Sequence, residues 1–240
     1  MRLDKFLANM LPLSRKEVNV LVKNGRVLVN GNVQKRADGH IIPETDVITL
    51  DGERILYAEY LYLMLNKPKG YVSATEDKKY KTVLDLVPEE FSHYELFPVG
   101  RLDIDTEGLL ILTNDGQLAH EMLSPKKHVD KVYYAEIDDE VTGEDILAFR
   151  KGVTLDDGYH TMPGELVILK SSDISKIELT IKEGKFHQVK RMFEAIGKHV
   201  IYLKRIKMGD VPLDETLALG EIRPLSEDEV AILKRKGQSK

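Results

Sequence analysis

The hydrophobic pattern of this chain changes near residue 58, and the change divides the sequence into two parts with different expected folds. Before it, apolar residues recur at helical spacing, as in the segment from Leu3 to Leu11. After it, short apolar runs alternate with turn-forming residues, a pattern typical of strands in an antiparallel sheet. The sequence therefore predicts an α+β protein with a small domain over residues 1–58 and a larger, mostly antiparallel mixed-sheet domain over residues 59–236.

The small domain is expected to contain two helices and a short sheet. Ser14, followed three residues later by Glu17, has the form of a capping box that starts the second helix. The pair Asn24-Gly25 ends this helix. The pair Asn30-Gly31 is a strong signal for a two-residue hairpin turn, and a last strand is expected over 46–50.

The larger domain is expected to alternate strands with a few helices. The expected strands cover residues 60–65, 95–99, 109–112, 132–137, 165–169, 177–181 and 200–203. The expected helices cover residues 116–123, 143–151, 188–196 and 227–234. Residues 234–240 have the composition of a frayed basic tail.

The charge of the chain is unevenly distributed. The net charge is −5, yet residues 1–36 and residues 182–207 each contain eight Lys/Arg and two Asp/Glu, a net charge of +6 per block. Phosphate binding depends on local potential, because ions screen exposed charges over about 10 Å. The two blocks are therefore either solvated faces or surfaces that bind nucleic acid, and charge alone leaves both interpretations open.

Composition excludes several kinds of site. The chain has no cysteine, which excludes disulfides, thiolate metal ligands and a cysteine nucleophile. His187 and His199 lack a third ligand at suitable spacing, so no metal site is expected. The longest apolar run, residues 60–65, is far shorter than the roughly 20 residues that span a bilayer, and no export signal is visible. We expect a soluble cytoplasmic protein without a membrane anchor.

The segment 100–116 holds the main candidate for a catalytic group. It places Asp103 in an acidic loop directly before a continuous apolar strand, which would hold a carboxylate rigidly beside the core. The same pattern also fits a turn-forming or helix-capping aspartate. Asp105 and Glu107 would form a two-carboxylate sugar hydrolase site with Asp103, but are interpreted instead as solvated loop acids.

Residues 1–50 resemble the S4 RNA-binding domain. The resemblance lies in the opening Arg-Leu-Asp-Lys-Phe-Leu, in Ser14-Arg15 and in the hairpin segment 25–31. It implies binding to structured RNA, mainly through phosphates, with the dipole of the second helix contributing at its N-terminus. The residues expected to bind RNA are Arg2, Lys5, Ser14, Arg15, Lys16, Lys23 and Arg26.

Four further segments, in order along the chain, resemble motifs of the RsuA-type ribosomal RNA pseudouridine synthases. These segments are residues 66–70, residues 100–110 with Gly-Arg-Leu-Asp, residues 131–133, and residues 183–192 with Gly-Lys-Phe-His-Gln-Val-Lys-Arg. Together with the S4-like part they span nearly the whole chain. The resemblance implies a fold made of an S4 domain followed by a pseudouridine synthase catalytic domain.

The resemblance implies three catalytic residues. Asp103 corresponds to the essential carboxylate, which either adds to the sugar or abstracts a ribose proton; both first steps stay open. Tyr133 corresponds to a tyrosine that stacks on the base and moves a proton. Lys190 corresponds to the basic partner of Asp103, often an arginine in the family, and Arg191 is the alternative partner.

The resemblance also implies a set of substrate-binding residues. Arg101 corresponds to an arginine that helps to expel the target base from its stack. His187 is expected to order its loop. The full set of expected substrate-binding residues is Lys67, Arg101, Leu102, Thr106, Gly108, Lys185, His187, Gln188 and Arg191.

The activity implied is the isomerisation of one uridine to pseudouridine in ribosomal RNA, by a monomer that needs no cofactor. The short C-terminus favours 16S small-subunit rRNA, at a uridine of the 516 type, in a precursor or assembly intermediate. Two alternatives remain: a 23S rRNA pseudouridine synthase of the same subfamily, and a non-catalytic RNA-binding ribosome-assembly factor. A sugar hydrolase would leave the S4-like part unexplained.

Overall fold

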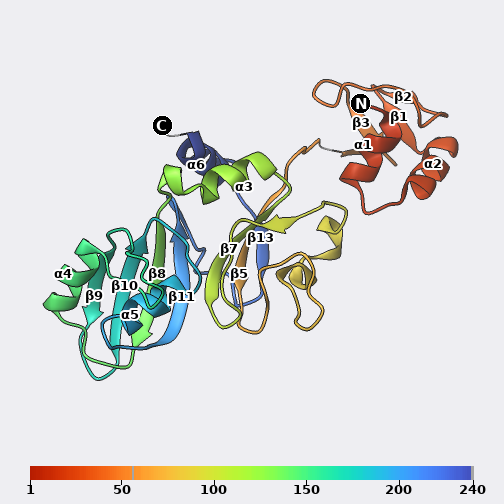
Figure 1. The fold of residues 1–240 in the computed structure, drawn as a ribbon. Coiled ribbons are helices and arrows are strands. Elements are labelled where there is room, and N and C mark those ends of the chain that lie inside the picture. The colour runs from red at the N-terminus through yellow and green to blue at the C-terminus, as the bar shows by residue number, and fades with distance from the viewer. Residues whose placement is uncertain (56, 239–240) are drawn as a thin grey trace. The chain divides into compact units, whose positions relative to one another are not determined.

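The computed structural model describes residues 1–55 and 57–238 and is drawn in Figure 1. The chain forms two compact units. The first contains Met1–Leu61 and Val87–Glu95, and the second contains Tyr62–Leu86 and Leu96–Lys240. The sequence places the boundary after residue 58, and its hydrophobic pattern gives no sign that Val87–Glu95 belongs with the first unit.

The first unit contains two helices and a four-stranded antiparallel sheet with the strand order β2-β1-β3-β4. The helices are α1 (Leu3–Met10) and α2 (Arg15–Lys23). The strands are β1 (Val27–Val29), β2 (Asn32–Val33), β3 (Ile48–Leu50) and β4 (Glu53–Ile55). A short 3₁₀ helix, Glu89–Phe91, also belongs to this unit.

Local signals in the sequence account for most of this unit. The capping box is present, because Ser14 and Glu17 exchange hydrogen bonds at the start of α2. Asn30 and Gly31 have φ of 51° and 78°, as a type I′ hairpin turn requires. Asp51-Gly52 repeats this geometry and leads into β4, a strand that the sequence pattern does not predict.

The second unit is built on a nine-stranded mixed sheet with the main order β13-β5-β7-β11-β8-β10-β9. Its strands are β5 (Tyr62–Lys67), β6 (Phe97–Pro98), β7 (Glu107–Thr113), β8 (Lys131–Ile137), β9 (Glu165–Lys170), β10 (Ser175–Ile181), β11 (Val200–Met208), β12 (Val211–Pro212) and β13 (Ile222–Pro224). β6 pairs with β7, and β12 pairs with β11. All pairs are antiparallel except β7 with β11, so the predicted largely antiparallel sheet is confirmed.

Four α-helices flank this sheet (Figure 1). They are α3 (Gly116–Leu123), α4 (Gly143–Lys151), α5 (Gln188–Glu194) and α6 (Glu227–Gln238), and two short 3₁₀ helices are Val83–Leu86 and Pro125–Lys127. α3 and α6 pack together over a core that includes Met64 and Ile111. α4 and α5 meet through Phe149 and Phe193, whose ring centroids lie 4.8 Å apart.

The structure corrects two expectations near the C-terminus. The frayed tail expected from Lys234 is helical as far as Gln238, and the rest of that expected tail lies outside the described residues. The strand expected over 200–203 extends to Met208, where it pairs with β8 and β12.

Candidate active site

The loop that carries Asp103 connects β6 to β7 and is held by hydrogen bonds to the polypeptide around it. Leu102 N donates to Ser73 Oγ at 3.0 Å, and Ser73 Oγ donates to Leu102 O, also at 3.0 Å. Thr106 N donates to Asp103 O at 3.0 Å, which closes the turn. These contacts fix the main chain on both sides of Asp103, so the carboxylate has a defined position.

Lys67, at the end of β5, adds a third support beneath this loop. Its side chain is 0% exposed, and its ammonium donates to the carbonyls of Pro68, Asp103 and Thr106 at 2.9–3.1 Å. Burial lowers the pKa of Lys67 to about 8. This corrects the expectation that Lys67 binds substrate, because all three of its donors are used within the protein.

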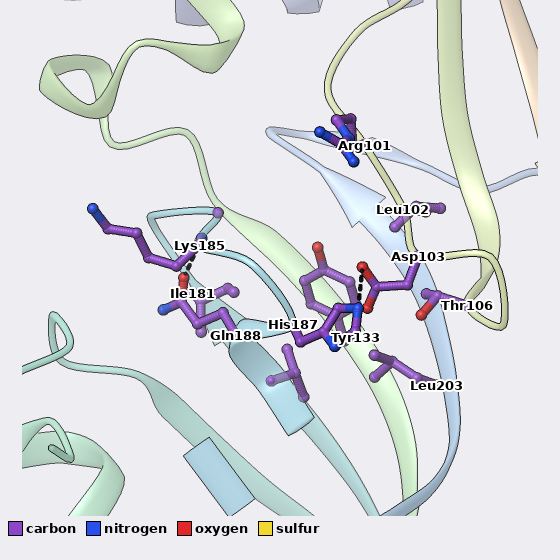
Figure 2. Close-up of a pocket in the computed structure, with 12 residues that line it drawn as sticks. Arg101, Leu102, Asp103, Thr106, Tyr133, Ile181, Lys185, His187, Gln188 and Leu203 are labelled. Carbon is purple, nitrogen blue, oxygen red and sulfur yellow. Dashed lines mark hydrogen bonds and ion pairs between the residues drawn. The ribbon is translucent and has the colours of Figure 1, made fainter. Parts of the chain in front are cut away.

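A pocket opens beside Asp103 at the start of α5 (Figure 2). Tyr133 from β8 is only 7% exposed and forms part of its wall together with Leu203 from β11. The pocket is lined by Arg101, Leu102, Asp103, Thr106, Tyr133, Ile181, Gly184, Lys185, His187, Gln188, Val189 and Leu203. Residues from four distant segments therefore meet at this pocket: three of them carry the motifs found in the sequence, and the fourth is β11.

Two basic side chains approach the carboxylate of Asp103. Lys190 Nζ lies 3.5 Å from Oδ2, and His187 Nε2 lies 3.6 Å from Oδ1. Figure 2 shows the His187 ring beside Asp103 at the pocket. Lys190, not Arg191, is thus the basic partner of Asp103, because Arg191 Nε donates to Asp156 Oδ1 at 2.7 Å.

Asp105 shares the same lysine. Lys190 Nζ lies 2.6 Å and 2.8 Å from its two carboxylate oxygens. Partial burial raises the pKa of Asp105, but the hydrogen bond and charge of Lys190 outweigh this effect and leave the pKa below its ordinary value. Asp105 is exposed yet not a free loop acid: it anchors the ammonium of Lys190 beside Asp103.

The structure also contradicts the expectation that Glu107 is a solvated loop acid. Its side chain is buried at the start of β7 and accepts a 2.6 Å hydrogen bond from the hydroxyl of Tyr202. Burial, and then this hydrogen bond, raise the pKa of Tyr202. Lys69 Nζ lies 5.0 Å from the centre of the Tyr202 ring. The sequence motifs do not identify Tyr202, because its partner lies 95 residues away.

Gly108 and Arg191 support the fold around the pocket and do not line it. Gly108 has φ of +102° in β7, and a Cβ there would lie 2.2 Å from the carbonyl oxygen of Arg205 on β11. Arg191 pairs with Asp156 and Asp157. Gly108 is buried in β7, where it permits the close β7–β11 pairing, and this corrects the expectation that it contacts substrate. Arg191 attaches α5 to the turn at 156–157.

Glu183 organises the loop that enters α5. It accepts hydrogen bonds from Met162 N at 2.9 Å, Gln188 Nε2 at 2.8 Å and the Tyr159 hydroxyl at 2.7 Å. Gln188 Oε1 in turn accepts from Lys185 N at 2.9 Å. Neither Glu183 nor Tyr159 is an expected site residue, although a carboxylate opening the 183–192 motif is a signal that could identify Glu183.

The residues expected to bind RNA in the first unit divide into two groups. Ser14 caps α2, Arg2 pairs with Asp4, and Arg26 pairs with Asp51. The side chains of Lys5, Arg15, Lys16 and Lys23 are exposed. Lys16 and Arg26 line one shallow groove together with apolar residues that include Val20.

Two general findings concern the whole described part of the chain. Within residues 1–55 and 57–238, no group of three or more His, Cys, Asp or Glu side chains could hold a metal ion. No helix in the same residues is long and apolar enough to cross a membrane.

The comparisons with known proteins agree with this geometry. Residues 61–195 match the model of the RNA pseudouridylate synthase family, and residues 1–41 match the S4 domain. An RNA pseudouridine synthase of Bacillus subtilis (strain 168), YtzG, is 51% identical over 97% of this chain and 98% of its own. The ribosomal small subunit pseudouridine synthase A of Escherichia coli (strain K12) is 41% identical over 96% of this chain and 99% of its own.

A solved structure leads to the same assignment. The crystal structure of a pseudouridylate synthase matches with a TM-score of 0.68 and 39% identity, covering 97% of this chain and 99% of that one. The family model alone matches more than half of the sequence and includes Asp103, Tyr133 and Lys190. The chain therefore belongs to the RNA pseudouridylate synthase family, as an isomerase with an N-terminal S4 domain.

Proposed function

We propose that this protein converts one uridine of 16S small-subunit ribosomal RNA, of the 516 type, to pseudouridine. The observation that carries the chemistry is the position of Asp103, beside Tyr133 at a pocket and within 3.6 Å of two basic side chains. The choice of small-subunit RNA is supported by the 41% identity to a ribosomal small subunit pseudouridine synthase A over nearly the full length of both chains.

In the proposed reaction, the bond between N1 of the base and C1′ of the ribose breaks and the base turns. A new bond then joins C5 to C1′, and the hydrogen at C5 leaves as a proton. Asp103 starts the reaction as an ionised carboxylate, either by adding to C1′ or by abstracting a ribose proton. Lys190 and His187 stabilise that negative charge, and Asp105 keeps the ammonium of Lys190 in place.

The other pocket residues bind and orient the nucleotide in this proposal. Tyr133 packs against the flipped uracil and assists the proton transfer from C5. Arg101, exposed at the pocket, takes part in expelling the base from its stack. Leu102, Thr106, Lys185 and Gln188 shape the remaining walls, in keeping with their positions in the pocket.

The S4 domain anchors the RNA in this proposal through phosphate contacts. Its Lys5, Arg15, Lys16 and Lys23 have exposed side chains, whereas Arg2 and Arg26 are paired with Asp4 and Asp51. Phosphate contacts position an RNA, while flanking bases and local RNA shape select the target. The proposed substrate is a precursor or assembly intermediate of the small subunit in the cytoplasm, bound by a monomer without a cofactor.

The proposal is tested in an Escherichia coli strain that lacks its own ribosomal small subunit pseudouridine synthase A. The chain and its Asp103→Asn variant are expressed separately, and pseudouridine is mapped by carbodiimide treatment and primer extension along 16S and 23S rRNA. We expect wild type, but not Asp103→Asn, to restore the stop at position 516 of 16S rRNA.

Other outcomes of this experiment would support one of the alternative functions. A new stop only in 23S rRNA would identify a large-subunit pseudouridine synthase. If the chain binds ribosomal particles but produces no stop in either RNA, it acts as a non-catalytic assembly factor in that host. Activity retained by Asp103→Asn would contradict the assignment of the catalytic carboxylate.

A further inference from the structure

Phe186 lies next to the pocket and, among the large apolar side chains that the structure describes, is the most exposed, at 70%. One face of its ring stacks on the imidazole of His187, with centroids 3.8 Å apart and planes inclined by 17°. His187 in turn points its Nε2 at Asp103, 3.6 Å from Oδ1. The other face of the Phe186 ring is therefore open, and the ring itself packs on His187, which contacts the carboxylate of Asp103.

The main chain holds this ring in a fixed place. His187 has a left-handed φ of +48°, a conformation that is uncommon for non-glycine residues. Arg191 Nη1 donates to the Phe186 carbonyl at 3.3 Å, and Gln188 Oε1 accepts from Lys185 N at 2.9 Å. The exposed ring is thus part of a turn held by hydrogen bonds. The loop would therefore lose little conformational freedom when RNA binds.

We propose that Phe186 is a positioning residue that stacks on a base of the RNA strand next to the target uridine. This inference rests on the proposed function, since it requires an RNA substrate at the Asp103 pocket. Aromatic side chains are the usual platforms for unpaired bases, because every base has a π-face that can stack without regard to sequence. The Phe186–His187 stack would continue through the neighbouring base.

The geometry favours a neighbouring base over the target base itself. The target uracil must reach Asp103 inside the pocket, where Tyr133 offers its ring and Phe186 is not among the lining residues. Phe186 instead lies outside the pocket with His187 between it and Asp103. A base stacked on its free face belongs to a nucleotide that stays outside while the uridine enters.

The charge around Phe186 suits the RNA backbone between these two nucleotides. Lys185, next to it in sequence, is exposed, and its Nζ lies 4.3 Å from the centre of the Tyr159 ring. Arg101 is exposed at the same pocket (Figure 2). A phosphate that joins a buried nucleotide to a stacked one would have these two cationic side chains available as partners.

The absence of tryptophan from the chain gives a direct spectroscopic test. Phe186→Trp places a single tryptophan at the proposed platform, and Leu147→Trp places one on α4, at an apolar residue 55% exposed that is not part of the pocket lining. Each full-length variant is titrated with 16S rRNA transcript while the anisotropy of labelled RNA reports binding. We expect strong fluorescence quenching for Phe186→Trp and none for Leu147→Trp.

A kinetic test measures the effect of the platform on turnover. Tritium released from [5-³H]uridine in 16S rRNA gives kcat and KM, since the reaction removes the hydrogen at C5. Stacking contributes about 1–3 kcal/mol per base, or roughly 5- to 150-fold. We expect Phe186→Leu to lower kcat/KM within that range, mainly through KM, and Phe186→Tyr to restore it; Leu147→Ala serves as the control.

The two tests separate failure of this inference from failure of the proposed function. RNA binding without quenching of the tryptophan at position 186 would overturn the platform, as would a Phe186→Leu variant with wild-type KM. A wild-type protein that binds 16S rRNA but releases no tritium would contradict the proposed activity, while the fluorescence titration would still decide whether a base stacks at position 186.

Discussion

At the scale of single residues, the ammonium of Lys190 interacts with two aspartates at the site. Its Nζ makes short contacts with Asp105 and a longer one, of 3.5 Å, with Asp103. The exposed Asp105 carboxylate thus holds the cation, while Asp103 keeps its oxygens available on the pocket side. A lysine suits this shared role, since a point charge needs no fixed bidentate geometry.

Replacing Lys190 by methionine should separate chemistry from binding. We expect Lys190→Met to lower kcat by at least about 100-fold, a loss typical of removing one electrostatic partner from an active site. RNA affinity should change little, because the ammonium is engaged by carboxylates and does not face the solvent freely. Single-turnover tritium release and filter binding measure the two effects, with the exposed Lys151→Met as the control.

Lys67 makes a second prediction at this scale, concerning stability and pH. Its pKa is about 8 in the folded protein against an ordinary value of 10.5, so between these values the unfolded chain binds more protons. Its contribution to stability is therefore greatest above pH 10.5 and is lost as the pH falls through about 8. From pH ~8 to ~9.5 this one group should raise the unfolding free energy by about 1–2 kcal/mol.

Urea denaturation at about pH 8 and about pH 9.5 tests the sign. The variant Lys67→Met should be less stable than wild type at both values, since three carbonyls lose their donor, and the gain between them should be smaller. The measurement stops at about pH 9.5 because tyrosines such as the half-buried Tyr202, with a raised pKa, oppose the trend at higher pH. Equal gains in both proteins would contradict a buried ammonium at Lys67.

At the scale of elements, the parallel contact between β7 and β11 depends on Gly108. A side chain there would collide with the main chain of Arg205, and φ of +102° is unfavourable for any L residue. We expect Gly108→Ala to destabilise the protein by about 3 kcal/mol or more, measured as a lower urea midpoint. Gly116→Ala, at the open start of α3, is the matched control and should be nearly neutral.

Elements with local signals could be predicted from the sequence, and contacts between distant segments could not. α3 and α4 have the bounds expected from the sequence, and local caps such as Asp115 accepting from Leu118 N account for where they begin. The convergence of Asp103, Tyr133 and Lys190 was accessible only through family motifs. The burial of Lys67 and the Glu107–Tyr202 bond depend on residues 36–95 positions away, for which no periodicity gives a sign.

At the scale of the whole molecule, the proposed function gives the two units separable tasks. The first offers exposed lysines on an S4 domain, and the second contains the complete constellation around Asp103. A substitution of an exposed lysine in the first unit should therefore change RNA binding without changing the rate of the reaction. A substitution at the Asp103 site in the second unit should change the rate without changing RNA binding.

Neutralising three exposed lysines tests this division. We expect Lys5→Gln, Lys16→Gln and Lys23→Gln together to weaken RNA binding and to reduce the slope of log K against log salt by about 0.7–0.9 for each phosphate that the protein no longer neutralises. The rate at saturating RNA should stay near wild type. Binding isotherms across a salt series, with single-turnover rates at saturation, measure both; an unchanged salt slope would place the anchor elsewhere.

The support of the Asp103 loop by Lys67 and Ser73 has an evolutionary consequence. The hydrogen bonds from Lys67 and Ser73 reach main-chain carbonyl and amide groups of the loop. They therefore do not depend on which side chains stand at positions 102 and 106. Mutations at the outer residues Arg101, Lys185 and Phe186 can accumulate while the carboxylate keeps its place. One chemistry can in this way be inherited unchanged while descendants diverge in the RNA sites that they modify.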